Sequence, residues 1–320
     1  MGLLIQMMRM MRTIVVLSLL AMAAHPQKGA ASPAAQEGAV HAQMRNVTYH
    51  FTDRVSVRIV SLAGALVPTT ADHWPVFDDK SSFNIYVDAA RILVLPSDLA
   101  GVLNSYVFAG RDAPLKDVSI AVEKGQLKIK GKLHGKGDIP FETVASLSAD
   151  PDGRVRLHTK KVKALHVPVK GLMDLFGVEI DDLIENGKVA GVEAQKDDLL
   201  LNLEQVLPPP HIHGPVTDIH AAGGFIVSVI GKPDKNSGTP ASSNFMAYKG
   251  NKLQFGKLLM NDADLTIIDL DPQDPLDFSL DRYKDQLVAG YSKITASFGL
   301  RVFMKDFAKL QPPAHTSARR

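Results

Sequence analysis

The histidines His211, His213 and His220 have a residue type and a spacing that suit metal chemistry. His211 and His213 are separated by one residue, so an extended backbone places both imidazole rings on one side of the chain. Neutral imidazole nitrogens bind zinc or copper, and a metal ion held in this way would suit a hydrolase. The loop is rich in proline and its spacing matches no strong metal-binding template, which favours a solvated polar loop. A metal-dependent hydrolase is therefore the least favoured functional hypothesis.

Two other stretches resemble chemical motifs but lack a necessary residue. Asp269, Asp271 and Asp274 are spaced like calcium ligands, yet the segment lacks the central glycine and terminal glutamate of an EF-hand loop. The segment 290–294, GYSKI, resembles a hydrolase nucleophile elbow without its final glycine. The absence of cysteine excludes disulfides, thiolate catalysis and cysteine–zinc sites. The sequence therefore predicts a protein that is not an enzyme and that uses no cofactor.

Positive charge is concentrated in residues 124–163, although the formal net charge of the whole chain is only +2. In an alternating strand pattern, five of these cations would lie on the outer face, namely Lys128, Lys130, Lys132, Arg154 and Arg156. A solvated face of an antiparallel sheet is one interpretation, and contact with an anionic membrane surface or lipid head groups is the other. Nucleic acid is not expected as a partner, because no aromatic residues interleave with these cations.

Strands are the main elements that would position these residues. From Val118 to Leu165, apolar and polar residues alternate in four short runs separated by turn residues, which predicts an antiparallel meander. One face of the meander would be apolar and the other would carry the cations. Similar alternation predicts strands at residues 47–51, 55–59 and 83–87, and an apolar run predicts a buried strand at 225–230.

Two helices that begin at a proline are predicted on either side of the meander. Their apolar residues follow helical spacing and are Leu99, Val102, Leu103 and Tyr106 after Pro96, and Leu172, Met173 and Phe176 after Pro168. A hairpin pattern follows each helix at a similar distance, which indicates a degenerate repeat.

The N-terminus has the features of an export signal. Arg9 and Arg12 precede a short apolar run with small residues near its end, as in a cleavable signal peptide. The run is shorter than the roughly 20 residues of a membrane-spanning helix. We expect a signal peptide at residues 1–24, with an uncleaved anchor as the alternative. The expected order after it is a flexible lead-in, a main α+β domain, a linker, a C-terminal extension and a disordered tail, at residues 25–45, 46–231, 232–243, 244–310 and 311–320.

The order of elements between Leu93 and Ile230 carries a resemblance to a known family. The matching stretches are Val118-Ser119-Ile120, Leu127-Lys128-Ile129-Lys130-Gly131, Ile139-Pro140-Phe141, Asp152-Gly153-Arg154-Val155, His166-Val167-Pro168 with Leu172, Leu207-Pro208-Pro209-Pro210 and Gly224-Phe225-Ile226-Val227-Ser228-Val229. In this arrangement the segment resembles the LmeA-like family of exported actinobacterial phospholipid-binding proteins, and through it the tubular lipid-binding superfamily. The resemblance covers somewhat under half of the chain.

The resemblance implies an α+β fold in which a curled antiparallel β-sheet wraps around amphipathic helices. The small β-rich C-terminal extension expected at residues 244–310 falls outside the resemblance. The sheet would enclose an elongated apolar cavity for acyl chains. The expected wall residues are the apolar residues of the two helices, Leu99, Val102, Leu103, Tyr106, Leu172, Met173 and Phe176. For any one of these residues taken alone, an ordinary place in the hydrophobic core is the favoured interpretation.

The leading hypothesis is an exported, non-enzymatic lipid-binding or lipid-transfer protein of the periplasm or cell envelope. Its partner would be a phospholipid or another acyl-chain lipid, with an anionic membrane surface as a second partner to test. The alternative is a ligand-free structural or adhesive exported β protein, which would have a solid core and associate through its sheet edges. The sequence leaves the identity of the lipid and the oligomeric state open.

Overall fold

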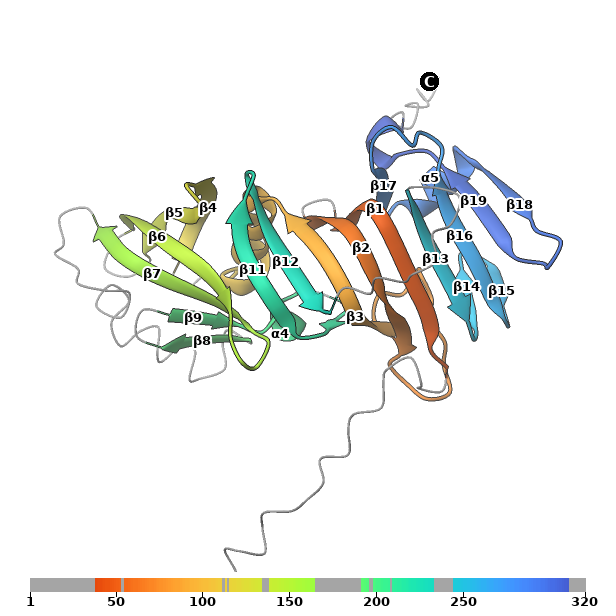
Figure 1. Ribbon diagram of the computed structural model, residues 1–320, viewed down its shortest axis with the longest axis horizontal. Coiled ribbons are helices and arrows are strands. Elements are labelled where there is room, and N and C mark those ends of the chain that lie inside the picture. Colours follow the sequence, from red (N-terminus) through yellow and green to blue (C-terminus); the bar gives the residue numbers. More distant parts are fainter. Residues whose placement is uncertain are drawn as a thin grey trace, which may run out of the picture.

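The structure is a computed structural model that describes residues 38–52, 55–110, 113, 115–133, 138–164, 191–195, 198–207, 209–232 and 244–310. These residues are mostly β-strand and form one large sheet, one smaller sheet and a short hairpin (Figure 1). The expected α+β fold, a curled antiparallel sheet wrapped around amphipathic helices, is wrong. The described helices are few and short, and the large sheet contains parallel as well as antiparallel pairs.

The larger sheet contains eleven strands. Its main path runs β11–β12–β3–β2–β1–β13–β16–β19–β18, with β10 beside β3 and β17 beside β1. In chain order its strands are β1 (Val40–Thr52), β2 (Val55–Pro68), β3 (Phe83–Val94), β10 (Ile212–His213), β11 (Val216–Ala222), β12 (Phe225–Gly231), β13 (Phe245–Gly250), β16 (Ala263–Asp269), β17 (Leu276–Ser279), β18 (Tyr291–Ile294) and β19 (Leu300–Met304). The strands predicted near residues 47, 55, 83 and 225 are confirmed as parts of β1, β2, β3 and β12.

Strand β1 connects strands from the N-terminal and C-terminal parts of the chain within one sheet. It pairs with β2 on one side and, on the other, with β13 from the C-terminal part of the chain. Ala42 and Met44 are buried in β1, so residues 40–45 belong to the sheet and not to a flexible lead-in. Residues 244–310 supply five strands of the same sheet, and β14 (Leu253–Phe255) and β15 (Leu258–Met260) form the separate hairpin.

The smaller sheet has six antiparallel strands in the order β4–β5–β6–β7–β9–β8. They are β4 (Leu115–Glu123), β5 (Gln126–Leu133), β6 (Ile139–Ala149), β7 (Val155–Ala164), β8 (Val192–Gln195) and β9 (Asp198–Leu201). The first four are the predicted meander. Lys124 and Gly125 form the turn between β4 and β5 with φ of 51° and 74°, as a tight two-residue hairpin turn requires.

The helices in the described residues are short. α2 (Pro96–Val102) and the π-helical turn η2 (Leu103–Val107) follow β3, which confirms the helix predicted after Pro96. The others are α4 (Leu203–Val206), α5 (Tyr283–Val288) and the 3-10 turn η3 (Phe307–Lys309). No helix in the described ranges has the length and hydrophobicity needed to cross a membrane. The helix predicted after Pro168 lies outside the described residues.

The two sheets are connected both by direct strand contacts and through a helix. Strand β11 of the larger sheet packs against β5 and β6 of the smaller sheet. Elsewhere α2 contacts both β2 of the larger sheet and β4 of the smaller sheet, so this helix bridges the two sheets. Figure 1 shows the smaller sheet at the left, next to β11 and β12, with the larger sheet extending to the right.

Candidate functional site

A cavity of about 190 Å³ lies between the facing sides of the two sheets. Its surface is almost wholly apolar, because most of the residues that face it are valine, leucine, isoleucine or phenylalanine. Strands β1, β2, β3, β10, β11 and β12 form one wall, and strands β4 to β9 form the other. Helices α2 and α4, which lie where the chain crosses between the sheets, also contribute to the lining.

Alternation along the strands produces both walls. On the larger sheet, β2 contributes Val55, Val57 and Ile59, and β12 contributes Ile226, Ser228 and Ile230. Residues two apart share a face of a strand, so each set points the same way. On the smaller sheet the wall consists of inward-facing meander residues, among them Ile129, Phe141, Thr143, Leu147, Val155, Leu157 and Thr159. The apolar face of the meander therefore covers a cavity as well as packed core.

The structure places three of the seven expected wall residues at the cavity. Leu99 and Val102 of α2 and Leu103 of η2 line it. Tyr106 does not line it, and this side chain is 40% exposed. The remaining three, Leu172, Met173 and Phe176, lie outside the described residues.

A carboxyl group and a hydroxyl group form a polar pair in the cavity wall. The Ser56 hydroxyl donates a hydrogen bond to Asp98 Oδ2 at 2.9 Å. Burial raises the pKa of Asp98, and this effect exceeds the opposing effects of the Ser56 hydrogen bond and the His50 charge. The two polar groups thus satisfy each other, although the carboxylate form of Asp98 is disfavoured by its surroundings.

A second hydroxyl in the cavity wall, that of Ser228, has no hydrogen-bond partner among the described residues. Ser228 is 6% exposed, and no donor or acceptor in the described part of the chain reaches its Oγ atom. The apolar pattern of residues 225–230 predicts a buried strand but assigns no role to this residue. The signal was available, since Ser228 is the only polar residue in that run.

The three lysines expected on the outer face of the meander are paired with acidic residues. Lys128 and Lys130 each place Nζ at 3.5 Å from a carboxylate oxygen of Glu142. Lys132 Nζ lies 2.7 Å from Asp117 Oδ2. Pairs as exposed as these contribute little to stability, so their main effect is to cancel local charge.

The two arginines are also paired. Arg154 contacts Asp150 and Glu193 at 2.8 Å each and Asp152 at 3.2 Å. Arg156 Nε lies 3.7 Å from Asp198 Oδ2. Together with the lysine pairs, these contacts leave no surplus of positive charge on the five expected cations. The electrostatic argument for an anionic membrane surface as a partner is correspondingly weakened.

The three histidines do not converge on one point. His211 Nδ1 lies 3.0 Å from the Glu204 carbonyl oxygen, and His213 Nδ1 lies 3.1 Å from the Glu204 carboxylate. His220 Nδ1 lies 2.9 Å from Asp218 Oδ2. The histidines do not belong to any group of three potential metal ligands found among the described residues. The hydrolase hypothesis therefore loses its structural basis.

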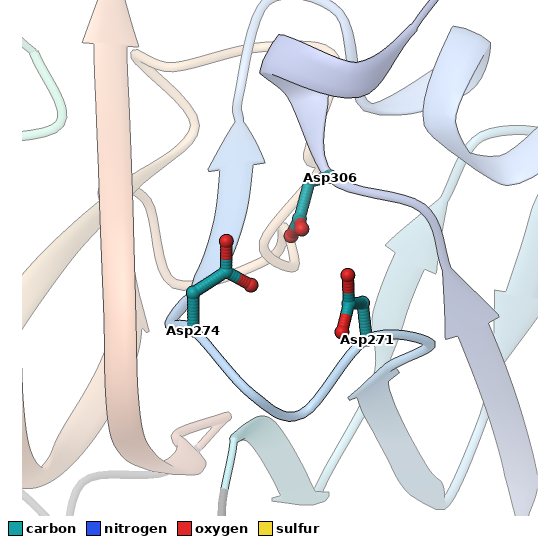
Figure 2. Close-up of side chains that lie close together, drawn as sticks. All are labelled: Asp271, Asp274 and Asp306. Carbon is teal, nitrogen blue, oxygen red and sulfur yellow. The ribbon is translucent and has the colours of Figure 1, made fainter.

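A different group, Asp271, Asp274 and Asp306, brings carboxylate oxygens within 4.8 Å of one another (Figure 2). The ammonium group of Lys309 lies among them, with Nζ 2.7 Å from Asp271 Oδ2, 3.2 Å from Asp274 Oδ2 and 2.9 Å from Asp306 Oδ2. Hydrogen bonds to these carboxylates, that to Asp271 foremost, raise the pKa of Lys309. The ammonium group of Lys309 thus takes the place that a metal ion would occupy. Asp271 and Asp274, which are spaced in the sequence like calcium ligands, belong to this ion-pair network.

The chemistry that the cavity offers is binding. It provides a large apolar surface, a satisfied Ser56–Asp98 pair and one unsatisfied hydroxyl. Comparison with known proteins adds no relative, since no family model, no curated protein and no solved structure matches the chain. The functional argument therefore depends on the geometry of this cavity.

Proposed function

We propose that this protein binds a lipid and holds the acyl chain in the cavity between its two sheets. The observation that carries the proposal is an almost wholly apolar cavity of about 190 Å³. Apolar cavities exclude water and accept apolar guests, and a cavity of about 150 Å³ is enough to bind benzene. Each methylene that moves from water into such a space contributes about 0.8 kcal/mol, so roughly six methylenes contribute about 5 kcal/mol.

The size of the cavity favours a ligand over an ordinary core. Protein interiors are packed like organic crystals and contain few voids larger than a water molecule. An unfilled cavity destabilises a protein by about 24 cal/mol for each Å³. For about 190 Å³ this amounts to about 4.5 kcal/mol, a large part of the stability of a typical protein. A bound acyl chain would restore the contacts that the wall residues lack.

The alternative, a ligand-free structural or adhesive protein, predicts a solid core between the sheets. The cavity is the observation that counts against it. An exported location in the periplasm or cell envelope remains part of the proposal on the strength of residues 1–24, whose pattern is that of a signal peptide. Lipid binding is also what the resemblance of residues 93–230 implies.

Lipid extraction from the purified protein, followed by mass spectrometry, tests the proposal directly. We expect acyl-chain lipid to co-purify, and we expect the lipid-free protein to take up a fluorescent probe that carries an alkyl chain. Absence of both co-purifying lipid and probe uptake would refute lipid binding.

A cavity-filling variant with a matched control locates the bound chain. In Val57→Phe a bulky ring enters the cavity from β2, whereas in Val288→Phe the ring projects from a residue that is 86% exposed. We expect probe affinity to fall by at least about tenfold in Val57→Phe, which corresponds to about 1.4 kcal/mol, and to be unchanged in Val288→Phe. Equal affinity in both variants would place the ligand outside this cavity.

A further inference from the structure

Ser228 places a single hydroxyl in an otherwise apolar part of the cavity wall. Its side chain faces the cavity from β12, between Ile226 and Ile230 on the same strand. The residues opposite it on the neighbouring strands are Ile92 of β3 and Ile219 of β11, and both also line the cavity. The hydroxyl is therefore surrounded by isoleucine side chains.

The isolation of this hydroxyl needs a physical explanation. Buried polar groups in proteins are almost always hydrogen-bonded, because an unsatisfied one loses its water partners without compensation. Ser228 is 6% exposed, and within the described residues no group satisfies its Oγ. By contrast, the Ser56 hydroxyl is satisfied by Asp98. A polar atom on a bound ligand is the partner that the cavity can offer to Ser228.

Charge restricts the chemical type of that polar atom. No lysine, arginine or histidine is among the described residues that line the cavity, and Asp98 is the lining residue with a carboxyl group. An anion buried there would lack a counter-charge and would face an acidic residue, which is strongly unfavourable. A neutral oxygen, such as a hydroxyl or an ester carbonyl, can hydrogen-bond with Ser228 without this penalty.

Volume restricts the number of chains. The cavity measures about 190 Å³, whereas pockets for drug-sized ligands are typically about 300–1,000 Å³. One slim alkyl chain suits this space better than the paired chains of a diacyl lipid.

From these observations, and resting on the lipid-binding function proposed above, we infer that the cavity takes a neutral single-chain lipid. A long-chain alcohol or a monoacylglycerol has the required chemistry. Ser228 hydrogen-bonds the oxygen of this lipid and so determines which lipids bind.

Displacement of a fluorescent alkyl probe from the purified protein tests this inference. The competitors are dodecanol, its hydroxyl-free counterpart dodecane, and the anion dodecanoate. We expect the wild-type protein to bind dodecanol about tenfold more tightly than dodecane, the effect of one hydrogen bond to a group that is otherwise unsatisfied. We also expect dodecanol to bind more tightly than dodecanoate at neutral pH.

The decisive variant is Ser228→Ala, with Ser148→Ala on the exposed side of β6 as the matched control. Ser228→Ala should fold, because it removes an unsatisfied group. It should bind dodecanol more weakly than dodecane, because the alcohol hydroxyl would then be buried without a hydrogen-bond partner. Ser148→Ala should keep the wild-type preference. An unchanged preference in Ser228→Ala, or dodecanoate binding as tight as that of dodecanol, would overturn the inference.

The test separates this inference from the proposed function. If dodecane and dodecanol both displace the probe with equal affinity from the wild-type protein, lipid binding stands and the role of Ser228 is refuted. If the probe itself does not bind the lipid-free wild-type protein, the lipid-binding function fails, and the inference fails with it.

Discussion

The same substitution, valine to phenylalanine, is expected to have opposite effects on stability at two positions of this protein. Val57 faces the cavity from β2, whereas Val302 of β19 is fully buried in packed core and does not line the cavity. Val57→Phe should stabilise the lipid-free protein, because the ring enters empty space. Val302→Phe should destabilise it, because the ring has to displace packed neighbours.

The magnitude follows from the volume of the cavity. At about 24 cal/mol per Å³, a ring that fills roughly a third of a cavity of about 190 Å³ contributes about 1.5 kcal/mol. Overpacking a filled core costs about 1–3 kcal/mol. The free energies of unfolding of the two variants should therefore differ by about 2.5–4.5 kcal/mol.

Urea unfolding of the lipid-free proteins, followed by circular dichroism, measures this difference. A fall in stability of Val57→Phe as large as that of Val302→Phe would mean that the space is already filled. That result would refute the cavity on which the proposed function depends.

Three further predictions concern hydrogen bonds and titrating groups. The Gln286 side-chain amide hydrogen-bonds the backbone groups of Ser279, Asp277 and Lys305, and Gln286→Leu leaves all three without this partner. Urea unfolding should show that the free energy of unfolding falls by at least about 3 kcal/mol. Burial raises the pKa of Asp98, so ionisation of this carboxyl group costs stability as the pH rises above about 3.9. Asp98→Asn removes this cost. In the same assay, the stability of the variant minus that of the wild type should therefore be larger at pH 7 than at pH 3. Burial also disfavours the Asp277 carboxylate, but hydrogen bonds from His50 and the Ala308 amide outweigh it and lower its pKa. The stability that Asp277 contributes should therefore be lost as the pH falls below about 3.9, and acid titration of Asp277→Asn should show a weaker loss than wild type.

Local sequence patterns were sufficient for local structure. Alternation and the Lys124-Gly125 turn predicted the meander, because strand faces and tight turns depend on residues close in sequence. Pro96 and the spacing of Leu99, Val102 and Leu103 predicted a helix whose apolar side lines the cavity.

Long-range features were not predictable in the same way. The pairing of β1 with β13 joins segments that are far apart in sequence, and no local pattern specifies such a partner. The ion pairs of Arg154 with Glu193 and of Arg156 with Asp198 depend on which strands become neighbours in the smaller sheet. The basic face was therefore visible in the sequence, whereas its neutralisation became visible only with the register.

Helix α2 offers a physical reason for the cavity. Two sheets that pack face to face are about 10 Å apart, and a helix with its side chains is itself about 10–12 Å wide. Where α2 contacts both β2 and β4, it keeps these two strands too far apart for their side chains to interdigitate directly. The seven residues of α2 extend over about 10 Å, whereas the fourteen residues of β2 extend over about 46 Å. The helix therefore covers only part of the facing surfaces, and strand residues of both sheets line the remaining space.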